Sequence, residues 1–309
     1  MLNILVTGGA GYIGSILCRS LVEEKEYRVI VYDSFSFGVE PILPLVGTDN
    51  FEVIEGDIRS EQVRGVVSKA DVIIHLAAVV GYPACDSNNC NAISTNVDGT
   101  KNIVKHLSSN QWLLYASTGS VYGQGKDFCS EDSSVNPLTL YATTKYEAEK
   151  IVMERENSIA LRFATVFGVS PRMRMDLLVN DLLFQAIRNK AVVIYEKGAR
   201  RTFLHCRDAA ESYLFTLNKF NQMKNQIYNV GNPLLNLTKY ELVTAMKRYV
   251  DFHILDENTK KDLDGRDYTV NFSKIQNQGY RSTYSLDDGI KELMKLYSLP
   301  SFYRYLRNA

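Results

Sequence analysis

The stretch Leu2–Gly14 constrains the fold of this chain more than any other. It combines a short apolar segment typical of a strand, a turn with three spaced glycines, and the first residues of a helix. Gly8 allows a sharp turn, Gly11 allows close approach to a pyrophosphate, and Gly14 allows the helix to pack on the strand. The helix then directs its first N–H groups and positive dipole end towards phosphates. The spacing alone also fits an ordinary tight turn.

The residues that follow favour the phosphate site over the ordinary turn. A helical pattern spans 15–22, an apolar strand spans 27–32, and Asp33 closes that strand. An acidic residue roughly 20 positions beyond the glycines is placed to bind the adenosine ribose hydroxyls. Because a carboxylate there repels a 2′-phosphate, the sequence predicts NAD rather than NADP.

Charge and cysteine usage exclude several classes of protein. Lys+Arg and Asp+Glu are equal at 35 each, so no broad field favours nucleic acid or an anionic membrane. The five cysteines form no CxxC pair, and none has a partner at zinc spacing, so we expect reduced thiols and no metal site. No apolar run reaches membrane-spanning length. We therefore expect a cytoplasmic protein with no nucleic-acid or membrane partner.

Strand and helix patterns alternate through the first half of the chain. We expect further strands at 51–55, 71–75, 112–116 and 159–163, and helices at 91–107 and 141–155. This alternation predicts an α/β fold with a doubly wound parallel sheet, a Rossmann domain over residues 1–168.

The pattern changes after Gly168. The second half predicts a smaller mixed α/β lobe over 169–309, with residues 200–231 partly returning to the first domain. We expect helices at 175–189, 208–219, 237–249 and 286–297, strands at 192–195 and 227–230, and an extended segment at 203–205. The last residues, 298–309, fit either a docked tail or an oligomer contact.

Two short segments follow predicted strands at the edge where a cofactor would lie. Asp57 is placed to bind an adenine amino group, although it fits equally well as the N-cap of a helix from Ser60 onward. Leu76, Ala77 and Ala78 are mostly small, which leaves room for a flat ring.

A catalytic pair is indicated by Tyr141 and Lys145, which lie one turn apart on a predicted helix. A free tyrosine has a pKa of about 10, and a nearby lysine cation and nicotinamide ring would both lower it. The phenolate could then take a proton from a sugar hydroxyl. Thr118, after the strand at 112–116, is placed to bind the same hydroxyl. A core tyrosine, a surface lysine and a capping Ser/Thr turn are the alternatives.

Six motifs in order resemble the extended short-chain dehydrogenase/reductase family, in its branch of nucleotide-sugar epimerases and dehydratases typified by UDP-galactose 4-epimerase. The resemblance covers nearly the whole chain. It rests on residues 8–14, 56–59, 75–78, 96–100, 117–123 and 141–145. It implies Tyr141, Lys145 and Thr118 as the catalytic set, and NAD as the cofactor. The implied NAD site comprises Gly8, Gly11, Tyr12, Ile13, Asp33, Asp57, Ile58, Leu76, Ala77, Ala78, Asn96, Ser117, Tyr141, Lys145 and Phe163.

The second half is similar to a sub-branch that includes bacterial nucleotide-heptose 4-dehydrogenases, through residues 165–181 and 200–208. The resemblance implies that Arg201 and Arg266 hold a diphosphate and that Tyr195 packs on the base. Arginine suits this role because its planar fork makes two parallel charge-assisted bonds, although each could be a surface residue. The implied nucleoside diphosphate sugar site comprises Thr118, Ser120, Thr165, Arg174, Asp176, Leu177, Tyr195, Arg201 and Arg266.

Departures from the family pattern reduce the number of candidate reactions. Gly119-Ser120 stands where 4,6-dehydratases carry an Asp-Glu pair, which argues against dehydration. Thr165 and the loop 79–85 differ from galactose epimerases, so the sugar stays open. We expect oxidation at C4, in a 4-epimerase or a 4-dehydrogenase. The alternatives are a 4-ketoreductase with exchanging cofactor and a non-catalytic NAD-binding regulator. The family also implies a homodimer through the helices at 91–107 and 141–155.

Overall fold

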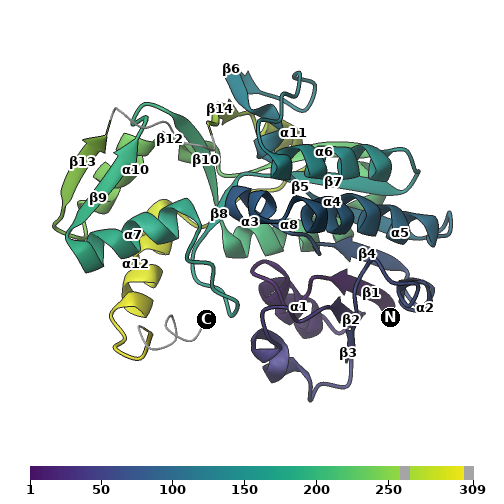
Figure 1. Cartoon of the computed structure of the whole chain (residues 1–309). Helices are drawn as coiled ribbons and strands as arrows, with labels where there is room; N and C mark the ends of the chain where they lie inside the picture. The colour runs from purple at the N-terminus through teal and green to yellow at the C-terminus, as the bar shows by residue number, and fades with distance from the viewer. Residues whose placement is uncertain (258–264, 303–309) are drawn as a thin grey trace.

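Seven parallel strands form the central sheet of this protein, for which a computed structural model describes residues 1–257 and 265–302 (Figure 1). Their spatial order is β11-β7-β5-β4-β1-β2-β3, and every neighbouring pair is parallel. The strands are β1 (Leu2–Thr7), β2 (Tyr27–Asp33), β3 (Phe51–Glu55), β4 (Val72–His75), β5 (Trp112–Thr118), β7 (Ser158–Phe163) and β11 (Gln226–Val230). This order reverses direction between β1 and β4, as in a doubly wound dinucleotide-binding fold.

Both faces of the sheet are buried. On β1, Ile4 and Val6 belong to one hydrophobic core, whereas Leu5 belongs to a second core. Because alternate residues of a strand point to opposite faces, the two cores lie on opposite sides of the sheet. One core contains residues of α1 (Gly14–Glu23) and α8 (Cys206–Asn218), and the other contains residues of α2 (Val63–Val67), α5 (Gly99–Lys105) and α6 (Leu140–Met153). The predicted α/β fold is confirmed.

The prediction of one continuous helix at 91–107 is wrong in detail. The segment forms α4 (Asn89–Ile93), a π-helical turn η2 (Ser94–Asp98) and then α5. Within that turn, Asn96 accepts a hydrogen bond from the backbone N–H of Val79 at 2.7 Å and donates to its carbonyl at 2.9 Å. A π turn widens the helix locally and is frequent at functional sites. Periodicity of apolar residues does not reveal it.

The remaining elements comprise three small sheets, further helices and 3-10 turns. The sheets are β12-β10-β8, β13-β9 and β14-β6. Their strands are β6 (Gln124–Cys129), β8 (Thr165–Phe167), β9 (Ala191–Tyr195), β10 (Arg200–His205), β12 (Asn236–Thr238), β13 (His253–Glu257) and β14 (Asp267–Val270). The helices are α3 (Tyr82–Ser87), α7 (Leu178–Asn189), α9 (Phe220–Met223), α10 (Lys239–Met246), α11 (Ser273–Asn277) and α12 (Leu286–Tyr297), with 3-10 turns η1 (Glu40–Leu45), η3 (Gly119–Tyr122) and η4 (Pro233–Leu235). Figure 1 shows α7, α10 and α12 grouped beside the large sheet.

Several predictions for the second half are confirmed and two are corrected. The strand expected at 227–230 is β11, which completes one edge of the large sheet. The helix expected at 237–249 begins at Lys239, because Thr238 forms a capping box with Glu241 after the short strand β12. The helix expected at 175–189 begins at Leu178. Of the segment 298–309, residues 303–309 lie outside the described residues. No helix in the described part of the chain is long and apolar enough to cross a membrane.

A buried histidine joins the carboxyl ends of β1 and β4 to α5. Nε2 of His75 lies 2.9 Å from the hydroxyl of Thr100, which itself donates to the Asn96 carbonyl at 2.7 Å. The Thr100 hydroxyl therefore accepts from Nε2, which leaves Nδ1 to accept from the Thr7 hydroxyl at 2.7 Å. Burial, together with the charge of Lys145, lowers the pKa of His75 to about 3.

We predict that His75 makes the protein acid-sensitive. The folded protein holds this imidazole neutral, so its contribution is complete above the ordinary histidine pKa of about 6.5 and is lost as pH falls from there towards 3. The free energy of unfolding from urea titration should fall by about 1.4 kcal/mol per pH unit more in the wild type than in His75→Gln. His253→Gln, at an exposed position, is the control. Equal slopes in all three proteins would contradict this account.

The third glycine of the turn is predicted to be intolerant of any side chain. A Cβ on Gly14 would lie 2.3 Å from the Gly8 carbonyl oxygen and 2.8 Å from Cα of Gly9, both backbone atoms. Gly14→Ala should therefore lower the free energy of unfolding by about 1–3 kcal/mol. Gly65→Ala within α2, where a Cβ meets nothing within 4 Å, should be neutral or slightly stabilising. Thermal melting that ranks the two variants in the opposite order would refute the packing argument.

Candidate active site

Gly8 and Gly11 of the glycine turn differ in what surrounds them. Gly8 has φ +75, and its Cβ would lie 2.7 Å from the backbone nitrogen of Ala77, so both conformation and packing require glycine. A Cβ on Gly11 would meet, among described atoms, the Gly8 carbonyl oxygen at 3.1 Å and nothing nearer. The space in front of Gly11, at the N-terminal end of α1, therefore fits a bound phosphate group.

Asp33 is held at the edge of the same turn. Its Oδ2 accepts a hydrogen bond from the Ala10 N–H at 3.0 Å, and its Oδ1 accepts from the Phe35 N–H at 2.9 Å. These two bonds fix the carboxylate at the carboxyl end of β2 and leave it further lone pairs. The arrangement suits recognition of a vicinal diol such as a ribose.

Three residues expected at the cofactor have structural contacts of their own. The Tyr12 hydroxyl donates to the Gly168 carbonyl at 2.7 Å, so it ties the glycine turn to the second half of the chain. Ile13 packs, partly buried, against the core. Ile58 is buried, and a Cβ on Gly99 would lie 2.5 Å from it.

Asp57 does not cap a helix from Ser60 onward, which was one of its two expected roles. The helix expected from Ser60 does not form, because α2 begins at Val63 with Gln62 as its N-cap residue. Instead Asp57 pairs with the Arg59 guanidinium and accepts from the Arg59 N–H at 2.8 Å, and these bonds lower the pKa of its carboxyl group. The adenine contact stays a prediction.

The loop after β4 is pinned next to the glycine turn. Leu76, Ala77 and Ala78 follow the strand directly, and the Ala77 N–H donates to the Thr7 hydroxyl at 3.4 Å. Asn96 holds the loop at Val79 and also donates to the Thr144 hydroxyl at 3.0 Å. Asn96 therefore couples this loop to the helix that carries Tyr141 and Lys145.

Tyr141 and Lys145 lie on the same face of α6. The helix begins after Thr139, whose hydroxyl accepts from the Ala142 N–H at 3.2 Å. Burial raises the pKa of Tyr141, while the charge of Arg174, a hydrogen bond with Thr118 and the charge of Arg266 lower it. The cations that favour the phenolate thus include two arginines that come from outside α6.

Lys145 is almost completely enclosed. Its Nζ lies 4.1 Å from the centroid of the Tyr115 ring, a cation–π contact. Burial lowers the pKa of Lys145 to about 7, against the opposing effects of Glu149 and Cys85.

Hydroxyl groups and an arginine gather at the end of β5. The Thr118 hydroxyl donates to the Ser120 hydroxyl at 3.0 Å and accepts from the Ser120 N–H at 3.1 Å. Nη1 of Arg266 donates to the Ser120 hydroxyl at 2.6 Å from a position 146 residues away in sequence. Phe163, at the end of β7, pairs with Thr118 in the sheet. The structure therefore brings Thr118, Ser120 and Arg266 together, as the sequence predicts.

An ion pair lies on the loop before α7. Nε of Arg174 donates to Asp176 Oδ1 at 3.1 Å, and a Cβ on Gly81 would lie 3.3 Å from Arg174 Nη2. Asn180 donates to the Arg174 carbonyl at 2.8 Å and so fixes the loop. Although burial raises it, the pKa of Asp176 is lowered overall by its bonds with Arg174.

The other expected substrate residues lie on the small sheets and at the start of α7. Thr165 begins β8, Leu177 is the N-cap residue of α7, and Tyr195 ends β9. The Tyr195 carbonyl accepts from Lys239 Nζ at 3.0 Å. Arg201 is buried on β10 and donates to the Arg200 carbonyl at 3.1 Å.

Sequence reasoning missed two buried charged residues beneath this site. The Ser117 hydroxyl, expected at the cofactor, donates to Glu149 at 2.6 Å, and Glu149 pairs with Arg162. The position of Glu149 four residues after Lys145 was a usable signal, because such residues share a helix face. Cys85 is buried near Lys145, and burial raises its pKa to about 11, but nothing in the sequence pointed to it.

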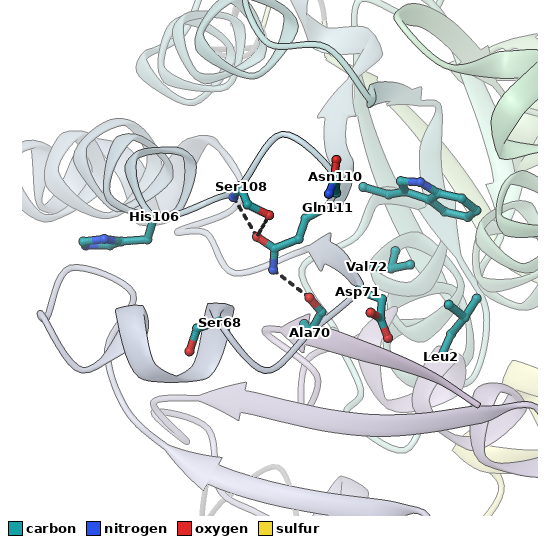
Figure 2. Close-up of a pocket in the computed structure, with 10 residues that line it drawn as sticks. Leu2, Ser68, Ala70, Asp71, Val72, His106, Ser108, Asn110 and Gln111 are labelled. Carbon is teal, nitrogen blue, oxygen red and sulfur yellow. Dashed lines mark hydrogen bonds between the residues drawn. The ribbon is translucent and has the colours of Figure 1, made fainter.

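The cavity of about 500 Å³ in Figure 2 lies elsewhere. It is lined by Leu2, Val72 and Trp112, which stand at the amino ends of their strands. Ligands of doubly wound sheets bind at the carboxyl ends, so this cavity is not the candidate active site. Among the described residues, no group of three or more His, Cys, Asp or Glu could hold a metal ion.

Comparisons with known proteins agree with this geometry. The sequence profile of the NAD dependent epimerase/dehydratase family matches residues 4–231. An uncharacterised UDP-glucose epimerase of Bacillus subtilis, YtcB, is 30% identical over 287 residues, covering 88% of this chain and 85% of that protein. UDP-glucuronic acid decarboxylase 6 of Arabidopsis thaliana is 31% identical over 84% of this chain and 79% of its own length.

Solved structures share the fold over almost the whole chain. UDP-glucuronic acid 4-epimerase of Bacillus cereus, in complex with UDP-glucuronic acid and NAD, has a TM-score of 0.86 at 24% identity, covering 99% of this chain and 100% of its own. UDP-glucose 4-epimerase of Thermus thermophilus with NAD has a TM-score of 0.82 at 20% identity, covering 96% and 99%.

We predict that Asp33 selects the dinucleotide. Asp33→Asn removes the charge that repels a 2′-phosphate and weakens charge-assisted bonds to ribose hydroxyls. NAD affinity measured by calorimetry should fall about 10-fold or more, since such bonds contribute about 1.5–3 kcal/mol, while NADP affinity should rise. Asp71→Asn, at an exposed carboxylate that accepts from the Asn3 N–H, is the control. An unchanged NAD to NADP ratio in Asp33→Asn would show that Asp33 does not face the ribose.

Proposed function

Because the chain belongs to the NAD-dependent epimerase/dehydratase family, we propose that this enzyme oxidises C4 of a nucleoside diphosphate sugar. The observation that carries the proposal is the convergence of Tyr141, Thr118 and Lys145 at the carboxyl edge of the sheet. The glycine turn of β1 opens at this same edge.

Tyr141 is the proposed base. It accepts the proton of the C4 hydroxyl, and the Thr118 hydroxyl hydrogen-bonds the same oxygen as charge develops on it. Arg174 and Arg266 favour the phenolate electrostatically. Because burial opposes ionisation of the phenol, the two arginines offset part of that cost.

The residues present fit a bound NAD. The space at Gly11 and the fixed carboxylate of Asp33 suit its pyrophosphate and adenosine ribose. When bound, NAD supplies the hydride acceptor for C4. Lys145 is placed to hold the nicotinamide ribose, and Ala77 and Ala78 leave room for the ring. The other cofactor residues expected from the sequence complete this proposed site.

The nucleotide part of the substrate is proposed to bind the smaller lobe. Arg201 and Arg266 would bind the diphosphate, and Tyr195 would pack on the base. Thr165, Arg174, Asp176 and Leu177 would line the sugar.

Two fates of the 4-keto sugar separate the candidate reactions. An epimerase returns the hydride to the other face of C4, whereas a dehydrogenase releases the keto sugar. Dehydratase chemistry has less support, because Gly119 carries no acid or base and the Ser120 hydroxyl is engaged with Arg266. Two relatives that are named UDP-glucose epimerases favour epimerisation, and the residues at 165–181 favour dehydrogenation, so both are kept.

We also propose a cytoplasmic homodimer that pairs through α4, α5 and α6, with the two lobes divided near residue 168. A dilution series in analytical ultracentrifugation should show a dimer at micromolar concentration. Monomer at every concentration would remove the dimer from the proposal.

The state of the purified cofactor distinguishes the two fates. Near-stoichiometric NAD or NADH released on denaturation after gel filtration supports an epimerase or a dehydrogenase that recycles NADH in place. A site that binds NAD weakly and reversibly supports a dehydrogenase or 4-ketoreductase with exchanging cofactor, and excludes the epimerase.

We predict that Tyr141→Phe abolishes turnover while leaving NAD bound. General-base catalysis is worth about 10²–10⁴-fold, so turnover of UDP-glucose, UDP-galactose or UDP-glucuronate should fall by at least that factor. Calorimetry should give an NAD affinity within about 3-fold of the wild type, since the ring is kept. Tyr146→Phe on the same helix is the control. Undiminished turnover in Tyr141→Phe would end the proposed mechanism.

A further inference from the structure

A buried ion pair lies directly beneath the proposed catalytic residues. Nε of Arg162 donates to Glu149 Oε2 at 2.9 Å, and Nη2 donates to Oε1 at 2.7 Å, so the pair is bidentate. The two side chains are only 4% and 2% exposed. Burying two charges costs so much solvation that packed hydrophobic residues stabilise a fold equally well. Stability alone therefore does not account for this pair.

The pair joins the three elements that carry the proposed chemistry. Glu149 lies on α6 one turn beyond Lys145 and two turns beyond Tyr141. The Ser117 hydroxyl donates to Glu149 Oε2 at 2.6 Å, and Ser117 precedes Thr118 on β5. Arg162, on β7, is the sheet partner of Ser117. One carboxylate thus fixes α6 relative to both strands at the point where the reaction is proposed.

Arg162 is itself held from the far side. Its Nη1 donates to the Tyr122 hydroxyl at 3.0 Å, which donates in turn to Asn229 Oδ1 at 2.7 Å on β11. Although burial lowers it, the pKa of Arg162 is raised overall by its bonds with Glu149. The guanidinium therefore stays charged and cannot turn away from the carboxylate.

We propose that Glu149 is a positioning residue for the reaction proposed above: held by Arg162, it fixes Ser117 beside Thr118 and keeps a negative charge one turn from Lys145. The inference rests on the proposed function for its chemistry, and on the contacts of Glu149 for its geometry.

The groups around Lys145 explain why the negative charge of Glu149 matters for it. Four groups face Lys145 besides Tyr141: Tyr115 from β5, His75 from β4, Cys85 from α3 and Glu149 from its own helix. At neutral pH His75 is uncharged, with a pKa of about 3, and Cys85 is a thiol, with a pKa of about 11. Glu149 is then the formal negative charge among these described groups. It offsets part of the burial that lowers the pKa of Lys145 to about 7.

The test is Glu149→Gln, which keeps the shape of the side chain and removes its charge. Lys145 should then lose its proton at lower pH. We expect kcat to fall at least 10-fold at pH 8, and the difference from the wild type to shrink towards pH 6. In a plot of kcat against pH, the alkaline limb should therefore shift to lower pH by about one unit. Glu149→Asp should restore part of the lost activity.

A matched control separates this effect from loss of stability. Asp208 is also buried, and its carboxylate accepts three hydrogen bonds from Thr283 and Tyr284. Asp208→Asn removes a comparable buried charge from α8 and should leave the shape of the pH profile unchanged. If Glu149→Gln lowers kcat by one factor at every pH, the effect of Glu149 on Lys145 is overturned. If kcat does not change at any pH, the whole proposal is overturned.

A variant with a smaller change provides a second test if Glu149→Gln does not fold. Ser117→Ala removes only the hydroxyl that Glu149 fixes, and should lower kcat several-fold with no shift of the alkaline limb. A kcat equal to the wild type would overturn the positioning of Thr118 through Ser117.

The pH dependence of NAD binding, measured by calorimetry, needs no turnover. If no nucleotide sugar is oxidised, but Glu149→Gln still shifts the pH at which NAD affinity is lost, the proposed function fails and the effect of Glu149 on Lys145 stands. If turnover is found and that pH does not shift, the effect of Glu149 on Lys145 fails alone.

Discussion

The close packing of α1 against the glycine turn is the constraint on which the rest of this structure depends. Backbone atoms of Gly8 and Gly9 occupy the space that any side chain at position 14 would need. The close contact between α1 and the glycine turn places the N-terminal end of α1 at the carboxyl ends of the strands, where the dipole of the helix favours an anion. The Thr7–His75–Thr100 hydrogen bonds then hold β1, β4 and α5 together at the same edge. The second half of the chain attaches here through the Tyr12 hydroxyl.

Burial on α6 influences which of its two proposed functional side chains is charged. Lys145 and Tyr141 are both desolvated, which disfavours the charged form of each and leaves lysine with a pKa of about 7. The neighbouring charges then decide which form persists. Glu149 acts on Lys145, whereas Arg174 and Arg266 act on Tyr141. The charges of Tyr141 and Lys145 are thus influenced by residues that come from different parts of the chain.

Much of the fold could be predicted from sequence, because strand alternation and glycine spacing are local signals. The strands at 27–32, 51–55 and 159–163 were predicted within one residue or so, since apolar residues make up most of each segment. The π turn at 94–98 was not predicted, and neither was the hydrogen bond from the distant Val79 N–H to the Asn96 side chain within it. Tertiary contacts of this kind leave no periodicity in the sequence.

The site was predictable to a similar extent. Motif order placed Tyr141, Lys145 and Thr118 at one edge of the sheet, and the resemblance implied that Arg266 holds a diphosphate. The contacts that hold these residues were not predictable, because the Glu149–Arg162 pair and the Arg266–Ser120 bond join segments far apart in sequence. The effect of Arg174 and Arg266 on the pKa of Tyr141 was not predicted, because spacing along a helix does not reveal which charges from other elements surround a phenol.

The most direct test of the central claim follows hydrogen at C4 of the sugar. The enzyme would be incubated with NAD and UDP-glucose, UDP-galactose or UDP-glucuronate carrying deuterium at C4, and the products analysed by NMR and mass spectrometry. Oxidation at C4 predicts deuterium either retained at C4 of an inverted sugar or transferred to the recovered nicotinamide. Turnover that leaves deuterium at an uninverted C4, while hydrogen at C3 or C5 exchanges with solvent, would contradict the account.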